Sequence, residues 1–521
     1  MPGSAWTARG LAVIAGVCAA LAFPPFGFLL GLLGYSLLLK LADRSGARPL
    51  RSAFFMGWLA GVGYFAVGVW WIVEAFLVDV QAHGWMAPFA LVLMSGGLAI
   101  FWGLATLCYC AIRPIGGGRI LVFAATLSGF EWLRGHVFTG FPWNLPGETW
   151  VAGSPLSQVA ALVGAYGLTF LTVCVAAAPA ALLDPGTKRA KFTPVVAAGL
   201  GLVICYIWGE IRLATAQPTL KNAPLVRLVQ ANIDQKHKWR PENLSEIVET
   251  YLRLSTIPGP HTPDIIVWPE GALPVVAEDL FAADSPYLSA LTRSFRPGQT
   301  LMMGANRADL RPAGEVAYFN SLIVLRAEPD RLVRIGHYDK HRLVPFGEFL
   351  PFGDIAAQLG IRALVHMPGD FTPGPDPRPL ALPGIPVFQP LICYEAVFPG
   401  LTNSVTRSGA RASWILNVSN DAWFGATSGP WQHLNIAGYR AIETGLPIAR
   451  ATPTGVTAMI DAYGRVQQKI GLGGVGVLDA RLPPALAATP YSRHGEMAFW
   501  LMLIGAGFVP LWARRHSLRF R

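Results

Sequence analysis

Hydrophobic residues dominate the first 210 or so positions and return near the carboxyl terminus, whereas the segment between them alternates short apolar and polar runs. About 20 predominantly apolar residues are enough to cross a bilayer as a helix. Stretches of this character occupy residues 11–23, 26–42, 54–76, 87–112, 120–133, 156–183, 194–208 and 497–512. The pattern predicts eight transmembrane helices, seven within residues 1–214 and one at 495–513. Pro24 and Pro25 separate the first two stretches, which leaves a re-entrant hairpin open as the alternative.

The composition supports a membrane protein, because 53% of the residues are hydrophobic and only 14% are charged. An ordinary soluble domain has about 25% charged residues. The net charge of +10 comes from basic residues at the borders of the apolar stretches. The clusters are Arg44, Arg48 and Arg51; Arg113 and Arg119; Lys188, Arg189 and Lys191; and Arg514, Arg515, Arg519 and Arg521. These clusters fall in alternate loops between the predicted helices. Because cytoplasmic loops are enriched in Lys and Arg, this pattern predicts that both termini lie in the cytoplasm and that residues 213–493 lie on the opposite side.

Residues 222–490 predict an external α/β domain, because short β-branched runs alternate there with amphipathic helical patterns. The expected strands are 225–229, 265–268, 300–304, 321–325, 391–393, 414–418, 449–451, 456–461 and 475–479. Helices are expected at 242–254 and 433–444. The Pro- and Gly-rich segment 340–374 predicts a long loop, which in a compact domain is usually functional.

Two ionisable residues of this domain are expected where a strand gives way to a turn. Glu270 comes after the strand 265–268 and Pro269, which would present its carboxylate rigidly, as a general base requires. A helix-capping or surface glutamate is the open alternative. Lys340 begins a charged run that ends in the turn Pro345-Phe346-Gly347, and a lysine held out of water there can stabilise an oxyanion. A solvated charge run is its alternative.

Cys393 is the third strand-end candidate. It ends the predicted strand 391–393 and is the only cysteine outside the apolar stretches. A turn at this point would direct both the sulfur and neighbouring amide groups at one substrate oxygen. Because the thiolate is the nucleophile, a base and a cation are needed nearby, and Glu270 and Lys340 are available. An inert buried cysteine remains the alternative.

The order Glu, Lys, Cys, each after a strand of one α/β domain, resembles the nitrilase superfamily. Together with the apolar amino-terminal half, it resembles the apolipoprotein N-acyltransferase family of the bacterial inner membrane. The resemblance extends over nearly the whole chain. It rests on Glu131 to Gly135 with Gly140 to Trp143, Val229 to Ile233, Trp268-Pro269-Glu270, Asp339-Lys340, Pro345 to Glu348, Cys393-Tyr394-Glu395 and Asn417 to Phe424.

This resemblance implies a membrane bundle with an external αββα sandwich. It implies Cys393 as nucleophile, Glu270 as base and Lys340 as cationic stabiliser. Glu348, Glu395 and Tyr394 would support the site. The implied reaction moves an acyl chain from a phospholipid, through a Cys thioester, to the α-amino group of a diacylglyceryl-cysteine apolipoprotein. No metal or organic cofactor is needed for it, and we expect a monomer.

Aromatic and aliphatic residues near these positions are candidates to line the path of the acyl chain. They are Trp239, Phe346, Phe349, Leu350, Trp423 and Phe424. Ordinary anchoring of loops into the core is the alternative for each of them.

Other functions are less consistent with the pattern. A membrane-tethered amidase for a small amide has the same three residues available, but a tether needs only one span. A transporter usually carries ionisable groups near the bilayer midplane, whereas Glu74, Glu131 and Arg134 lie near span ends, where snorkelling or mutual pairing also explains them. Nucleic-acid binding lacks both a basic patch and a module.

Overall fold

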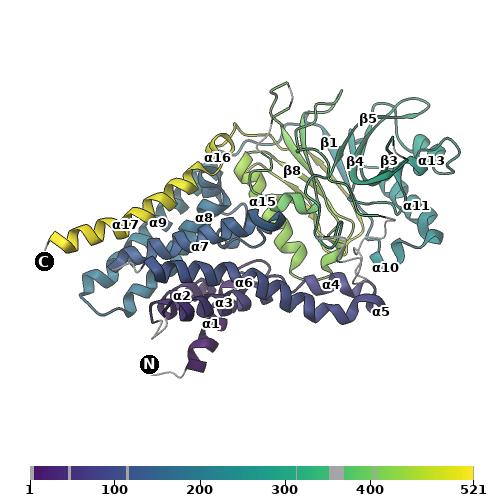
Figure 1. Cartoon of the computed structure of the whole chain (residues 1–521). Helices are drawn as coiled ribbons and strands as arrows, with labels where there is room; N and C mark the ends of the chain where they lie inside the picture. Colours follow the sequence, from purple (N-terminus) through teal and green to yellow (C-terminus); the bar gives the residue numbers. More distant parts are fainter. Residues whose placement is uncertain are drawn as a thin grey trace. The chain divides into compact units, whose positions relative to one another are not determined.

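The computed structural model describes residues 5–44, 49–112, 116–312, 314–350, 369–402, 405–406 and 408–519, with side chains up to residue 508 in the last helix. Arg48, Arg113 and Arg521 of the predicted basic clusters, and 351–368 of the predicted loop, lie outside these residues. The chain divides into two compact units (Figure 1). The helical unit comprises Met1–Ala216, Thr427–Thr444 and Ala488–Arg521, and the sheet unit comprises Gln217–Ala426 and Gly445–Ala487.

The helical unit contains most of the apolar sequence. Its helices are α1 (Ala5–Ala20), α2 (Leu33–Asp43), α3 (Pro49–Gly68), α4 (Ile72–Leu77), α5 (Val80–His83), α6 (Ala87–Ile112), α7 (Arg119–His136), α8 (Ala160–Ala177), α9 (Lys188–Ala214), α15 (Gly429–Thr444), α16 (Pro490–His494) and α17 (Met497–Arg519). Helix α15 interrupts the sheet unit in sequence but packs here, where the Tyr439 hydroxyl donates to the Gly147 carbonyl at 3.0 Å.

Four segments of the described chain are long and apolar enough to cross a membrane. They are Pro49–Gly68, Val80–Ile112, Leu156–Leu183 and Lys188–Ala214. Ala5–Ala20 and Met497–Phe508 are apolar but shorter. The predicted single span 54–76 is interrupted, because α3 ends at Gly68 and α4 begins only at Ile72. A helical apolar region with four candidate spans is thus confirmed, and the number of eight spans stays a prediction.

Glu131 and Arg134 form a buried ion pair within α7, so mutual pairing explains these two charges. The Trp102 indole N–H donates to Glu131 Oε1 at 2.5 Å, and the Arg134 guanidinium also donates to the Phe141 and Trp143 carbonyls. Both charged side chains are at most 1% exposed. A buried ion of this kind persists only when it is paired and hydrogen-bonded, and here it fixes the chain that follows α7.

The sheet unit contains two β-sheets within its described residues. The first has the strand order β11-β1-β2-β3-β4-β5 and the second has the order β10-β9-β8-β7-β6. The strands are β1 (Leu225–Gln230), β2 (Ile265–Trp268), β3 (Thr300–Leu310), β4 (Val316–Ala327), β5 (Leu332–Asp339), β6 (Phe388–Ile392), β7 (Trp414–Val418), β8 (Ile448–Ala451), β9 (Thr457–Ile460), β10 (Val466–Ile470) and β11 (Gly476–Arg481). The predicted α/β domain is confirmed.

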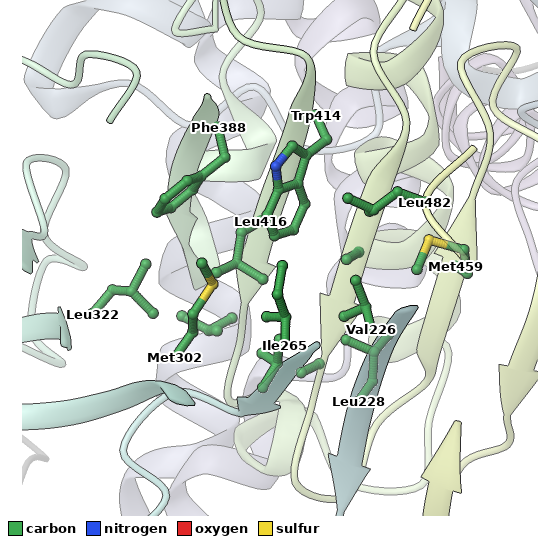
Figure 2. Close-up of a cluster of buried hydrophobic side chains, with 14 of the residues drawn as sticks. Val226, Leu228, Ile265, Met302, Leu322, Phe388, Trp414, Leu416, Met459 and Leu482 are labelled. Atoms are coloured by element: carbon green, nitrogen blue, oxygen red, sulfur yellow. The ribbon is translucent and has the colours of Figure 1, made fainter. Parts of the chain in front are cut away.

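The two sheets pack face to face around one apolar core. Val226 and Leu228 of β1 share this core with Trp414 and Leu416 of β7, as Figure 2 shows. Residues two apart on a strand point to the same face, so each strand contributes alternate side chains. The intervening side chains of the first sheet, such as Ile266, face outward to a second core.

Helices α10 (Gln235–Lys238), α11 (Leu244–Ser255), α12 (Ala277–Leu280) and α13 (Leu288–Ser294) belong to the same unit. The second core joins the outer face of the first sheet to three of them, through Tyr251 of α11, Leu280 of α12 and Leu291 of α13. This arrangement of a helical layer on two stacked sheets leaves the strand ends available for chemistry.

Candidate active site

Cys393 begins a tight turn, Cys393–Val397, directly after β6, so the strand ends one residue earlier than predicted. Its φ is +50°, in the left-handed region that residues with a Cβ rarely occupy. Such a conformation costs about 1–3 kcal/mol and is concentrated at functional sites. The side chain is 7% exposed. The turn therefore holds the sulfur in one orientation at the strand end.

Glu270 follows β2 at the end of a buried parallel strand, as the sequence predicted. The backbone of β3 passes unusually close to it, because a Cβ placed on Gly304 would come within 2.4 Å of the Glu270 Cα. The Ala272 N–H also donates to the Gly304 carbonyl at 3.1 Å. The glycine is therefore required for the turn that presents the carboxylate.

Lys340 follows β5 and bridges two carboxylates. Its Nζ lies 3.0 Å from Glu270 Oε1 and 2.9 Å from Glu348 Oε1, and the side chain is 1% exposed. Burial alone would lower the pKa of Lys340, but the two carboxylates outweigh it and raise the pKa above the usual range. Lys340 is therefore charged at neutral pH.

Asn320 of β4 completes this cluster, and the sequence patterns gave no role to it. Its Nδ2 donates to Glu270 Oε1 and to Glu348 Oε1, each at 2.7 Å. The backbone carbonyl of Asn320 accepts from the backbone N–H of Lys340 at 2.8 Å. A polar residue at the edge of an apolar strand pattern was the only signal available.

The two carboxylates differ in their remaining oxygens. Glu348 Oε2 accepts from the Val344 N–H at 2.8 Å, so both of its oxygens are hydrogen-bonded. Glu270 Oε2 is buried and accepts no hydrogen bond from the residues that the structure describes. Glu270 is therefore the carboxylate with an oxygen available to take a proton.

Glu395 joins the segment of Lys340 to the turn of Cys393. Its Oε1 accepts from the Tyr338 hydroxyl at 2.7 Å and from the His341 N–H at 2.8 Å. Its Oε2 accepts from the Ile392 N–H at 2.7 Å. Burial raises the pKa of Glu395, and these bonds to the charged form oppose the rise. These hydrogen bonds indicate that Glu395 connects the end of β5 to the turn of Cys393.

Tyr394 is buried in the same turn, with its ring 5.0 Å from that of Phe398.

The thiol of Cys393 is not in a disulfide and is held in its neutral form. Burial raises its pKa to about 12, the Glu270 charge raises it too, and the Lys340 charge lowers it. All three predicted residues are buried, and the charges of Glu270 and Lys340 both act on the Cys393 thiol. Because a thiol with this pKa is protonated at neutral pH, nucleophilic attack requires a base to remove the proton.

The motif from Asn417 to Phe424 forms a second buried network, at the carboxyl end of β7. The Arg450 guanidinium lies 2.7 Å from Asp421 Oδ2 and also donates to the Asn417 side chain. The Ser419 hydroxyl donates to Asp421 Oδ1 at 2.8 Å. Ser419 and Asp421 also influence the pKa of Cys393, so this network contributes to the surroundings of the Cys393 thiol.

Lys238 was also missed by the sequence analysis. It is 2% exposed, donates to the Gly271 carbonyl next to Glu270, and has a pKa lowered by burial to about 8. It adds a second positive group beside the candidate base. Only its place in a short basic run, Lys236 to Lys238, was visible in the sequence.

The candidates for the acyl-chain path lie on three segments. The Phe346 N–H donates to the Phe349 carbonyl at 2.8 Å, and Leu350 follows in the same turn. Phe346 is 58% exposed, whereas Phe349 and Leu350 are half-buried. Trp423 and Phe424 lie half-buried in the turn Asp421–Phe424, and Trp239 is half-buried after α10. In the described part of the chain no group of His, Cys, Asp and Glu could hold a metal ion.

A double-sheet α/β domain with Glu, Lys and Cys at its strand ends defines a protein of the carbon–nitrogen hydrolase class. The Carbon-nitrogen hydrolase family model matches residues 225–491. The Apolipoprotein N-acyltransferase N-terminal domain model matches residues 15–178. The two matches correspond to the sheet-forming and the apolar parts of the sequence.

Curated relatives extend the match over nearly the whole chain. An apolipoprotein N-acyltransferase of Caulobacter vibrioides is 50% identical over 510 residues, which cover 97% of this chain and 94% of the relative. One from Allorhizobium ampelinum is 38% identical over 507 residues, covering 95% and 93%. One from Agrobacterium fabrum is 38% identical over 525 residues, covering 97% of each. The chain belongs to the apolipoprotein N-acyltransferase family and is an enzyme.

Proposed function

We propose that this enzyme transfers an acyl chain from a phospholipid to the α-amino group of an apolipoprotein's diacylglyceryl-cysteine. The observation that carries the proposal is the free Oε2 of buried Glu270, in a site that also holds Lys340 and Cys393. The names of the relatives supply the reaction class. The site supplies a nucleophile, a base and a cation.

In the first half-reaction Glu270 Oε2 takes the Cys393 proton, and the sulfur attacks the ester carbonyl of the phospholipid. The Lys340 ammonium has three N–H donors. Two serve Glu270 and Glu348, and the third is directed to the oxyanion. When the carbon–oxygen bond breaks, Glu270 returns its proton to the leaving alkoxide. The products are a Cys393 thioester and a lysophospholipid.

In the second half-reaction the amine of the apolipoprotein attacks the thioester carbonyl. Glu270 takes a proton from the nitrogen, the carbon–sulfur bond breaks, and the thiolate leaves. The proton then returns to sulfur, which regenerates the resting thiol. The sequence is a ping-pong mechanism that needs no cofactor.

Both proposed substrates carry lipid chains, so we propose that they reach the active site from the membrane surface. We propose eight spans in residues 1–214 and 495–513, both termini in the cytoplasm, and a catalytic domain at 222–490 on the periplasmic face of a bacterial inner membrane. Holding the site at the leaflet surface replaces a search through solution by one within the membrane. We expect the enzyme to act as a monomer.

Intact mass spectrometry of the detergent-purified protein tests the acyl-enzyme directly. Incubation with phospholipid should add one acyl mass that hydroxylamine removes, and Cys393→Ala should show no increase. Absence of the adduct in the folded wild-type protein would contradict the proposal. Turnover of a small amide by that protein would instead favour a membrane-tethered amidase.

The turn from Phe346 to Leu350 should matter for lipid turnover. Replacing Phe349 and Leu350 by Ser should reduce phospholipid turnover about tenfold, because each removed side chain contributes roughly 1.5–3 kcal/mol when fully buried and both are half-buried here. Leu310→Ser, at a position 74% exposed, is the matched control and should leave turnover unchanged. Equal turnover in both variants, with a lower melting temperature for the Phe349→Ser, Leu350→Ser variant, would assign the turn to anchoring alone.

A further inference from the structure

An apolar groove of about 470 Å³ runs along the helical unit between α7, α8 and α9. Its walls include Leu121, Leu168, Phe170 and Leu202, together with small residues of α9. Both α8 and α9 lie in segments long and apolar enough to span a membrane. In the proposed membrane arrangement the groove is therefore open to hydrocarbon rather than to water.

One face of α9 forms a regular wall of this groove. Thr193, Ala197, Gly201 and Cys205 all line it. Residues four apart lie on the same face of an α-helix. From Thr193 to Cys205 the helix rises about 18 Å, at 1.5 Å per residue. This length suits one extended acyl chain lying along the helix.

Positive charges precede the groove-lining residues at the amino-terminal end of α9. Arg189 precedes Thr193 by four positions, and the Thr193 hydroxyl donates to the Arg189 carbonyl at 2.7 Å. Lys191 precedes Pro194, which also lines the groove, by three positions. Neither Arg189 nor Lys191 is paired with a carboxylate among the described residues, whereas nearby Arg119 lies 2.5 Å from Asp184.

We propose that this groove binds one acyl chain of an anionic phospholipid, with Arg189 and Lys191 contacting its phosphate head group. Apolar walls leading to unpaired basic side chains match the two chemical parts of such a lipid, and basic pockets between membrane helices bind anionic head groups. In the proposed orientation this end faces the cytoplasm. The bound lipid therefore lies in the leaflet opposite the active site and serves as a ligand rather than as an acyl donor.

Native mass spectrometry in detergent tests the proposal, with an equimolar mixture of phosphatidylglycerol and phosphatidylethanolamine as the probe. The wild-type protein should retain one phosphatidylglycerol in preference to phosphatidylethanolamine. Gly201→Phe should reduce this retention at least tenfold. A Cβ at Gly201 meets no atom within 4 Å, so the ring enters the groove without a clash at the backbone.

Gly199→Phe is the matched control. A Cβ at Gly199 also meets nothing within 4 Å, and this residue does not line the groove. It should retain phosphatidylglycerol as the wild type does.

Arg189→Gln with Lys191→Gln should keep the bound lipid but lose the head-group preference. Equal retention in both phenylalanine variants would overturn the groove site, and an unchanged preference in the glutamine variant would overturn the head-group contacts.

Discussion

Glu270→Gln should slow acyl-enzyme formation about 10³-fold at pH 7, within the range that general bases contribute. The thiol pKa of about 12 is the reason, because only about 1 in 10⁵ molecules is then a thiolate at pH 7. Without the base, the residual rate should rise about tenfold per pH unit up to about pH 10, because hydroxide must generate the thiolate. Single-turnover mass spectrometry across this range measures both effects.

Glu348→Gln is the control for this prediction. It removes an equal charge beside Lys340, but from a carboxylate whose two oxygens are both hydrogen-bonded. It should slow acylation less than Glu270→Gln does and should not produce the tenfold rise per pH unit. If Glu348→Gln, and not Glu270→Gln, gave an acylation rate that rises tenfold per pH unit, Glu348 rather than Glu270 would be the general base.

Glu270 and Lys340 meet at one edge of the first sheet because β2, β3 and β5 run in the same direction. Strands β2 and β3 are parallel, and β4 is antiparallel to both β3 and β5. Residues that follow strands of one direction meet at one edge of a sheet. The expectation that each reactive residue lies at a strand end therefore pointed to a shared site.

No residue range was predicted for two of the strands, and each lacks the pattern of a half-buried strand. Strand β10 is exposed along most of its length and carries Gln467, Gln468 and Lys469. Strand β5 alternates only weakly, because Arg334 is exposed and its neighbours are half-buried. Edge strands gain stability from one neighbour and tolerate polar residues, so their hydrophobic signal is small.

The hydrogen bonds of the site could not be predicted from the sequence for a related reason. Asn320 lies opposite the end of β5 because the register pairs Ser321 with Asp339. That register depends on the antiparallel pairing of β4 with an unpredicted strand. The contacts of Asn320 with Glu270 and Glu348 therefore became visible only in three dimensions.

Lys340→Met should abolish acyl-enzyme formation and also destabilise the domain. Removing one partner of a buried ion pair costs about 3–5 kcal/mol, because the remaining charge is left uncompensated. Here two carboxylates, Glu270 and Glu348, would face each other without the ammonium. One of them must then take a proton, so the variant loses the oxyanion donor and weakens the base at once. Intact mass spectrometry and thermal unfolding measure the two losses separately.

A double variant separates the chemistry from the folding. Adding Glu348→Gln to Lys340→Met removes one of the facing carboxylates and leaves a side chain that can still hydrogen-bond to Asn320. The double variant should recover most of the lost stability, because a single carboxylate remains in the cluster. It should still form no acyl-enzyme, because no cation remains to bind the oxyanion. Acylation restored together with stability would mean that Lys340 holds the cluster together and takes no part in the reaction.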